Sequence, residues 1–301
     1  MNVFKKITAT LGAGALALTM VACSDSAENA GGEGEKGTIT LGYIPSWTDG
    51  LSTAYLLDDQ LTEMGYEVEH QTVSDAAVLY TGIANGDIDI FASAWPEVTH
   101  AEYMERYGED IEDLGTYYDG AKLHLSVPEY MEDVNSVTDL VGQGERFDGT
   151  IYGIEPGAGL TRATEQDVMP GYGLEGEYAL ETSSTPAMLS ELKSAVDAER
   201  DIVVTLWSPF WANNEFPVKA LEDPEGLYGE PESLHFLSRT GFAEDFPEIA
   251  DWVGQLKLSD EQYSDLENTV VNEFGEGQEL EAVEDWISRN EGVLPALPNQ
   301  E

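Results

Sequence analysis

Strand-like and helix-like segments alternate over residues 38–92, and this alternation limits the choice of fold. Thr38 to Ile44 carries alternating β-branched residues, which is typical of a strand. The expected elements of this stretch are strands at residues 38–44, 67–73 and 88–92, and helices at residues 52–64 and 76–84, the second capped by Asp75. The order β-α-β-α-β predicts a parallel sheet covered by helices, an α/β fold.

A second series of strands and helices follows a polar stretch, residues 100–115, that we expect to form a helix and a loop. Its expected elements are strands at 121–127, 150–154, 178–181 and 202–206, and helices at 136–141, 160–168 and 186–198. A strand at 235–237 and three helices within residues 246–289 complete the chain. The helical tail is expected to return to the first series. Two lobes crossed twice by the chain, with a hinged cleft between them, are therefore predicted.

This interpretation divides the chain into five parts. They are 1–22, a signal peptide; 23–37, a lipidated Cys and flexible tether; 38–125, the first part of lobe 1; 126–210, lobe 2; and 211–301, the crossover and the helical return to lobe 1. The tether is assigned because residues 24–37 are small, polar and acidic.

The N-terminus has the pattern of an export signal. Lys5 and Lys6 precede an uncharged stretch, residues 7–22, that is too short for a stable membrane span. The segment Met20-Val21-Ala22-Cys23 resembles a bacterial lipobox, and this implies cleavage before Cys23 and a lipid on its sulfur. The expected location is extracytoplasmic, anchored to the bacterial cell membrane. An ordinary signal peptide with an unrelated Cys is the alternative.

The formal net charge is −46, from 13 Lys and Arg against 59 Asp and Glu. Phosphate backbones are bound by Lys and Arg, so this charge argues against a nucleic-acid partner. The carboxylates are spread along the whole chain. We therefore expect a protein that works in high salt, where self-repulsion between like charges is screened. A merely acidic secreted protein is the alternative.

Three Trp residues, Trp47, Trp95 and Trp207, each follow an expected strand. In open α/β sheets the carboxyl ends of strands are where ligands bind. Three indole faces in one cleft would suit a quaternary ammonium group, which donates no hydrogen bond and is attracted by aromatic rings. The other interpretation of each Trp is packing in the core or between lobes. His100 follows Trp95 by five residues and would bring a polar group to the same cleft.

The turn from Glu155 to Leu160 is rich in glycine and leads from a strand into a helix. Free backbone N–H groups at such a helix start favour an anion, although a plain turn would have the same sequence. The segment lacks the dinucleotide-binding spacing and a P-loop Lys. The four His residues show no metal-ligand spacing, and no Gly-x-Ser-x-Gly motif occurs. We expect no metal, no cofactor and no enzymatic activity.

The chain resembles the glycine betaine/choline substrate-binding proteins of ABC importers over nearly all residues after the tether. Five segments carry this resemblance: Gly42-Tyr43-Ile44-Pro45-Ser46-Trp47, Ala94-Trp95-Pro96-Glu97-Val98-Thr99-His100, Gly120-Ala121-Lys122, Gly153-Ile154-Glu155-Pro156-Gly157-Ala158-Gly159, and Val204-Thr205-Leu206-Trp207-Ser208-Pro209-Phe210-Trp211. The resemblance implies a two-lobed type II periplasmic binding protein fold. It also implies a monomeric lipoprotein that delivers a compatible solute to permease subunits for osmoprotection.

The same resemblance implies roles for individual residues. Trp47, Trp95 and Trp207 would form the cage for the trimethylammonium group. The ligand carboxylate would be held by three residues: His100, Gly159 and Leu160. Asp49 resembles the choline-binding branch, in which an Asp approaches the cation, whereas the intact Gly157-Ala158-Gly159 turn resembles the betaine branch. Glycine betaine is the favoured ligand; proline betaine, carnitine and choline remain alternatives, and an enzyme on the same scaffold is a further one.

Overall fold

The structure is a computed structural model and describes residues 36–298. The expected signal peptide, Cys23 with its expected lipid and most of the expected tether lie outside these residues. Residues 36–298 belong to one compact unit. At its start, Lys36 donates a 2.6 Å hydrogen bond to Glu248. The folded part thus begins slightly before Thr38.

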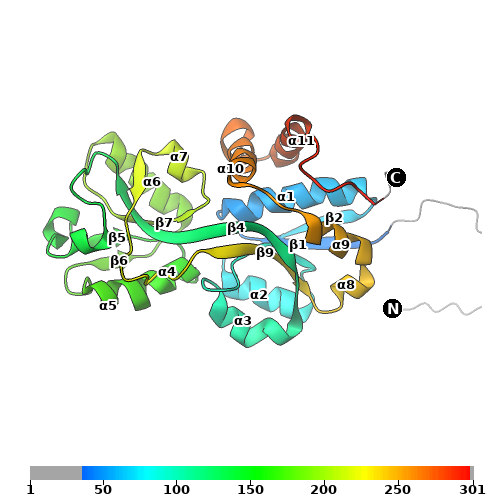
Figure 1. The fold of residues 1–301 in the computed structure, drawn as a ribbon, viewed down its shortest axis with the longest axis horizontal. Coiled ribbons are helices and arrows are strands. Elements are labelled where there is room, and N and C mark those ends of the chain that lie inside the picture. The colour runs from blue at the N-terminus through cyan, green and yellow to red at the C-terminus, as the bar shows by residue number, and fades with distance from the viewer. Residues whose placement is uncertain (1–35, 299–301) are drawn as a thin grey trace, which may run out of the picture. The chain divides into compact units, whose positions relative to one another are not determined.

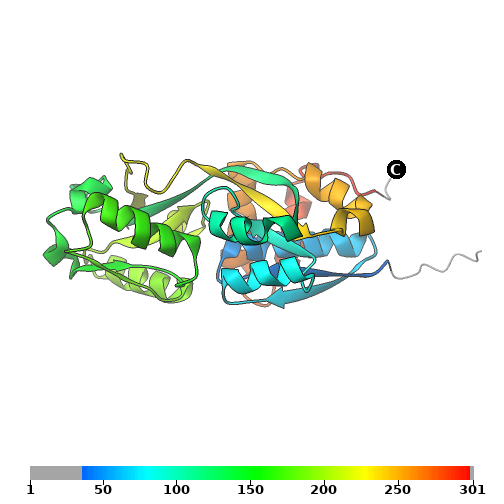
Figure 2. The same cartoon turned by 90° about the horizontal axis from the view of Figure 1, so that it is seen from below.

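The first series of strands forms the parallel sheet that the sequence predicts. Its strands are β1 (Thr38–Tyr43), β2 (Glu67–Thr72) and β3 (Ile90–Ala94), with β1 between the other two and parallel to both. Helix α1 (Thr48–Glu63) and helix α2 (Ala76–Asn85) lie on opposite faces of this sheet (Figures 1 and 2). Asp75 caps α2 as expected, by accepting the backbone N–H of Ala77.

One long strand connects the two parts of the sheet. Strand β4 (Ile111–Pro128) follows α3 (Ala101–Tyr107) and the short helix η1 (Gly108–Asp110). It pairs antiparallel with β9 (Glu232–Arg239) along its first half and with β7 (Val204–Ser208) along its second. The expected helix and loop over residues 100–115 is therefore correct only up to Asp110.

The second series of strands continues the sheet beyond β4. Its order is β4-β7-β5-β6, and β8 pairs with β4 beside it. The remaining bounds here are β5 (Thr150–Tyr152), β6 (Ala179–Glu181), β8 (Val218–Ala220), η2 (Val137–Leu140), η3 (Gly144–Phe147), α4 (Gly159–Ala163), the π-helical η4 (Thr164–Val168), α5 (Met169–Tyr172), α6 (Thr185–Asp197) and α7 (Ala212–Glu215).

We call β1, β2, β3 and β9 with their helices the first lobe, and β5 to β8 with theirs the second lobe. Strand β4 belongs to both, and Figure 1 shows it running from one lobe into the other. The segment between β8 and β9 brings the chain back to the first lobe. The arrangement is the α/β, two-lobed fold that the sequence predicts.

The C-terminal helices return to the first lobe, as expected. They are α8 (Phe242–Asp245), α9 (Pro247–Gln255), α10 (Asp260–Asn268), the π-helical η5 (Thr269–Phe274) and α11 (Glu279–Arg289). Helix α11 packs on α1. Trp252 and Trp286 are almost fully buried in this region, and a Ser259–Gln262 capping box starts α10. In residues 36–298, no helix has both the length and the apolar character needed to cross a membrane.

Candidate functional site

The candidate site is a pocket at the junction of the two lobes. It encloses about 340 Å³ of space outside the protein atoms, part of it open to solvent. That size suits a small ligand. Its lining residues come from both lobes and from β4: Trp47, Asp49, Trp95, Thr99, His100, Leu123, Ile154, Ala158, Gly159, Leu160 and Trp207. All seven pocket residues expected from the sequence lie in this set, whereas Cys23 lies outside the described residues.

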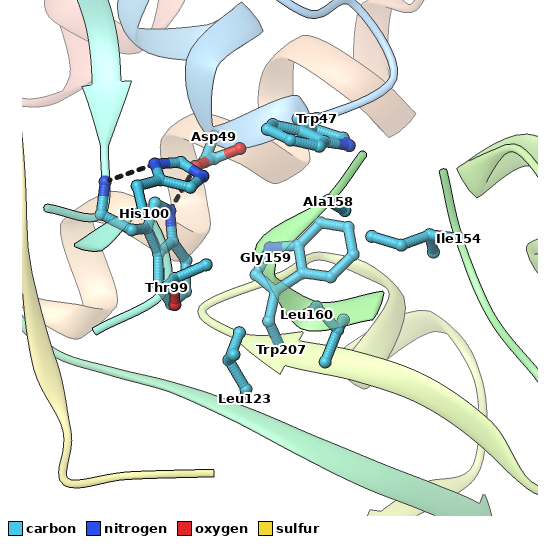
Figure 3. Close-up of a pocket in the computed structure, with 11 residues that line it drawn as sticks. Trp47, Asp49, Thr99, His100, Leu123, Ile154, Ala158, Gly159, Leu160 and Trp207 are labelled. Carbon is cyan, nitrogen blue, oxygen red and sulfur yellow. Dashed lines mark hydrogen bonds between the residues drawn. The ribbon is translucent and has the colours of Figure 1, made fainter. Parts of the chain in front are cut away.

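The three Trp side chains reach the pocket from three different strand ends. Trp47 is the N-cap residue of α1, after β1, and Trp95 directly follows β3. Trp207 lies on β7 in the second lobe. Figure 3 shows the Trp47 and Trp207 rings beside the same space. Trp95 and Trp207 are each only 5% exposed, so their indoles are largely removed from water. The pocket therefore has large aromatic surfaces on both lobes.

Trp207 and Trp47 are each supported by a second ring. Phe210 stacks on Trp207 with ring centroids 3.9 Å apart. Trp47 lies nearly parallel to His100, at 6.1 Å and an interplanar angle of 17°. Trp211, four residues after Trp207, lines a separate groove between the lobes.

Asp49 places a buried carboxyl group in the wall of the pocket. Its Oδ2 accepts the Ser93 hydroxyl at 2.7 Å and the Trp95 indole N–H at 3.0 Å. Burial raises the pKa of Asp49 because the charged form loses its hydration, although these hydrogen bonds act in the opposite direction. No Lys or Arg of the described residues forms a salt bridge with it. A cationic ligand would supply the missing positive charge.

His100 is buried as well, and its tautomer follows from its hydrogen bond. Its Nδ1 accepts the backbone N–H of Trp95 at 3.2 Å (Figure 3). A ring nitrogen that accepts carries no proton, so the neutral ring bears its hydrogen on Nε2. Burial lowers the pKa of His100 to about 3, and the ring is therefore neutral near pH 7. Its Nε2–H is a donor suited to a carboxylate.

The first residues of α4 form the opposite wall. The helix starts at Gly159, after Ala158 as N-cap. The first N–H groups of a helix have no partner within it, so those of Gly159 and Leu160 remain available as donors. Gly159 also packs tightly against the first lobe: a Cβ on this residue would lie 2.1 Å from the carbonyl oxygen of Thr99. Glycine is thus required for this approach of the lobes.

A second buried acid lies behind the pocket. Glu267 of α10 is fully buried and accepts the Thr48 hydroxyl. Burial raises the pKa of Glu267 to about 8, and the negative charge of Asp49 adds to the effect. Neither acid belongs to a metal-binding group: within residues 36–298, no three His, Cys, Asp or Glu side chains gather as metal ligands would.

Four lining residues were not expected from the sequence: Thr99, Leu123, Ile154 and Ala158. Thr99, Ile154 and Ala158 lie within segments that carry the family resemblance. Leu123 lies on β4, which reaches the pocket only because this strand connects the lobes. An apolar residue on a strand gives no signal for such a position.

Residues 37–289 match a family described as the substrate binding domain of ABC-type glycine betaine transport systems. A glycine betaine/carnitine transport binding protein of Listeria monocytogenes is 38% identical over 149 residues, which is 49% of this chain and 48% of that protein. The chain thus matches about half the length of this relative.

Two solved structures resemble the whole folded part. One is the glycine betaine, L-proline-binding protein (ProX) of an ABC transporter from Borrelia burgdorferi, with a TM-score of 0.79 and 30% identity over 86% of this chain and 97% of that one. The other is lactococcal OpuAC in its closed conformation with glycine betaine. Its TM-score is 0.76, with 32% identity over 84% of this chain and 96% of that one.

Proposed function

The chain belongs to the family of substrate-binding domains of ABC-type glycine betaine transport systems, and we propose that its own ligand is glycine betaine or a closely related quaternary ammonium solute. Proteins of this kind work outside the cytoplasm and deliver their ligand to permease subunits. The observation that carries the proposal is the composition of one pocket. Indole rings from both lobes and a neutral His N–H donor lie around the same space.

The aromatic part of the pocket suits the trimethylammonium group. Such a group has no N–H to donate, so hydrogen-bond acceptors alone do not select it. Each indole face contributes roughly 0.5–2 kcal/mol to binding a cation, more when the site is desolvated. Trp47, Trp95 and Trp207 are proposed as this cage, and the buried Asp49 carboxylate adds attraction for the same positive charge.

The other part of the pocket suits a carboxylate. We assign the Nε2–H of His100 and the backbone N–H groups of Gly159 and Leu160 as its donors. Hydrogen bonds from fixed donors to an ionised carboxylate are roughly twice as strong as neutral ones. Choline has no carboxylate and would leave these donors without a ligand partner inside the pocket.

Choline remains the second candidate because of Asp49. A buried carboxylate without a salt bridge favours a ligand with a net positive charge. Glycine betaine carries its own compensating carboxylate, whereas choline does not. The relative affinities for choline and glycine betaine decide between the two ligands. Carnitine and proline betaine also carry a carboxylate, so the argument for glycine betaine applies to them as well.

A catalytic role for His100 is less consistent with its surroundings. A general base needs a free acceptor atom and a pKa near the working pH. His100 already uses its unprotonated nitrogen for the Trp95 backbone, and burial lowers its pKa to about 3. We therefore propose a transport receptor without enzymatic activity.

The attachment and habitat of the protein are also proposals. Lipidation of Cys23 would hold the receptor at the membrane by a flexible tether, next to its permease. A net charge of −46 supports work in high salt. Mass spectrometry of the membrane-extracted protein tests the first proposal by the presence of acyl chains on Cys23. Thermal melting between low and molar salt tests the second, since a melting temperature that does not rise would contradict it.

Calorimetric titration of the chain after Cys23 with glycine betaine, proline betaine, carnitine and choline in high salt tests the ligand assignment. Tight binding of the betaines with weak choline binding is expected. Tight choline binding would instead make Asp49 the decisive group. No heat with any of the four would remove the ligand assignment and leave the fold unaffected.

A further inference from the structure

Glu155 connects the two lobes through a single carboxylate. From the first lobe, the Ser46 hydroxyl donates to its Oε1 at 3.0 Å and the Trp47 indole N–H donates to its Oε2 at 3.2 Å. From the second lobe, the backbone N–H of Thr185 donates to Oε1 at 3.0 Å and its hydroxyl to Oε2 at 2.8 Å. Each carboxylate oxygen therefore bridges one donor from each lobe.

We call Glu155 and its partners Ser46, Trp47 and Thr185 the Glu155 cluster. Its hydrogen bonds require an ionised carboxylate. Its partners are two N–H groups and two hydroxyls, all of which act as donors. An ionised carboxylate only accepts, and it has room for four hydrogen bonds. Thr185 is also the first residue of α6, a helix of 13 residues, and the N-terminus of a helix stabilises a negative charge. No Lys or Arg of the described residues is paired with Glu155.

The cluster also fixes one wall of the pocket. Trp47 has no side-chain capping bond at the start of α1, and the bond from its indole to Glu155 ties the edge of its ring to the second lobe. On the lobe-2 side, the same turn is held by Thr161, whose hydroxyl donates to the carbonyl oxygen of Glu155. The ring of Trp47 is thus oriented by a residue that reaches it only while the lobes are together.

We propose that Glu155 is a positioning residue that holds the lobes closed and, through the same bonds, sets the Trp47 ring against the bound ligand. The proposal rests on the proposed function only for the identity of that ligand. Closing the lobes completes the Glu155 cluster, and opening them breaks the two bonds from Ser46 and Trp47. We call the two bonds from Ser46 and Trp47 to Glu155 the latch. Because its donors are neutral, the latch contains no ion pair for salt to screen, which suits a strongly acidic protein in high salt.

The first test is Glu155→Gln, which keeps the size of the side chain. The amide keeps only one accepting oxygen, so either the Trp47 indole N–H or the Thr185 backbone N–H loses its acceptor and the set of four bonds is broken. We expect glycine betaine to dissociate about tenfold faster or more in stopped-flow experiments, and a cooperative thermal transition of the variant shows that it is folded. Glu145→Gln is the matched control, since Glu145 is an exposed carboxylate of the same lobe and should leave dissociation unchanged.

A second variant separates the latch from lobe contact in general. Tyr103 of the first lobe donates its hydroxyl to the carbonyl oxygen of Gly157 in the second, and Trp47 takes no part in this bond. A double-mutant cycle between Glu155→Gln and Trp47→Phe should give a combined loss of affinity well below the product of the single losses. In the cycle between Tyr103→Phe and Trp47→Phe, the combined loss of affinity should equal the product of the single losses. A multiplicative result for the Glu155 pair would overturn the positioning role.

The interlobe distance gives a reading that does not depend on the ligand. With one spin label on each lobe, the closed population should fall at least threefold in Glu155→Gln relative to the unsubstituted protein. A closed population that is absent from the unsubstituted protein, or equal in both, would overturn the latch. Failure of the unsubstituted protein to bind any betaine would count against the proposed function alone.

Discussion

The indole N–H of Trp95 donates a 3.0 Å hydrogen bond to Oδ2 of Asp49. This bond joins an aromatic wall of the pocket to its one lining carboxyl group. Asp49 also accepts the hydroxyl of Ser93, which in turn accepts the hydroxyl of Tyr117. The chain of bonds runs from the pocket into the buried centre of the first lobe, and it holds the Trp95 ring in one plane. Asp49 therefore affects both the charge and the geometry of the site.

Replacing Asp49 by Asn should weaken cation binding and stabilise the fold. The amide oxygen can still accept from Trp95, so the change removes mainly the charge. We expect about a tenfold loss of affinity for choline and a smaller loss for glycine betaine, which brings its own carboxylate. The unfolding temperature should rise, because a buried carboxyl group without a salt bridge is costly. Calorimetric titration and thermal melting measure the two effects.

Asp110→Asn, an exposed change in the same lobe, is the control for net charge and should alter neither the affinity nor the unfolding temperature.

The affinity for a cation should also depend on pH through Asp49. Burial raises its pKa, so protonation removes the negative charge at a higher pH than for an ordinary Asp. Cation affinity should accordingly fall as the pH is lowered, and this fall should vanish in Asp49→Asn. Equal pH profiles for both proteins would contradict the assignment.

Replacing His100 by Ala should discriminate between ligands. The variant loses the Nε2–H donor that we assign to the carboxylate, and a hydrogen bond to a charged group is worth about 1.5–3 kcal/mol. Affinity for glycine betaine should fall at least tenfold. Choline is the control ligand because it has no carboxylate, and its affinity should change much less. Parallel losses for both ligands would show that His100 only supports the pocket.

Replacing Trp95 by Ala tests the cage. Trp95 is only 5% exposed, so the change removes one indole face and leaves a space in the pocket wall. We expect a loss of affinity of tenfold or more for any quaternary ammonium ligand, equivalent to about 1.4 kcal/mol. Trp95→Phe keeps a ring and should lose less. A loss below tenfold in the Ala variant, measured by calorimetry, would mean that Trp95 is a packing residue.

Local patterns in the sequence were sufficient to predict the first lobe and most of the pocket. Pro96 cannot continue a central strand, so Trp95 was expected at the end of β3, and the structure places it there. The five-residue spacing brings His100 back to Trp95, because the backbone N–H of His100 donates to the Trp95 carbonyl at 2.8 Å. These features depend on neighbours in sequence and can be predicted from it.

Other features depend on partners that are distant in sequence. Residues 111–115 end a stretch that was expected to form a helix and a loop, but pairing with β9 makes them the start of β4. The role of Glu155 likewise requires Ser46 and Thr185, which are 109 and 30 residues away. Within its own motif, Glu155 looked like part of a turn. Such contacts exist only once the chain has folded, so a single sequence does not reveal them.

Stability should decrease as the pH rises through the titration of Glu267. Burial raises its pKa to about 8 from an ordinary value of 4.5, so between these values the folded protein holds a proton that the unfolded chain has lost. The contribution of Glu267 to stability is thus complete below pH 4.5 and is lost as the pH passes 8. Its size is up to a few kcal/mol. Urea unfolding followed by Trp fluorescence at pH 5, 7 and 9 measures it.

Glu267→Gln isolates this effect, because the amide stays neutral at every pH and can still accept the Thr48 hydroxyl. The variant should match the unsubstituted protein at pH 5 and exceed it at pH 9. His100, whose pKa is lowered to about 3, destabilises the fold only as the pH falls below about 6.5 and cancels in this difference. Glu261→Gln, exposed on the same helix, is the control for the loss of one carboxylate. If the Glu267→Gln curve runs parallel to that of the unsubstituted protein from pH 5 to 9, Glu267 is already ionised in the fold, and a positive group must reach it.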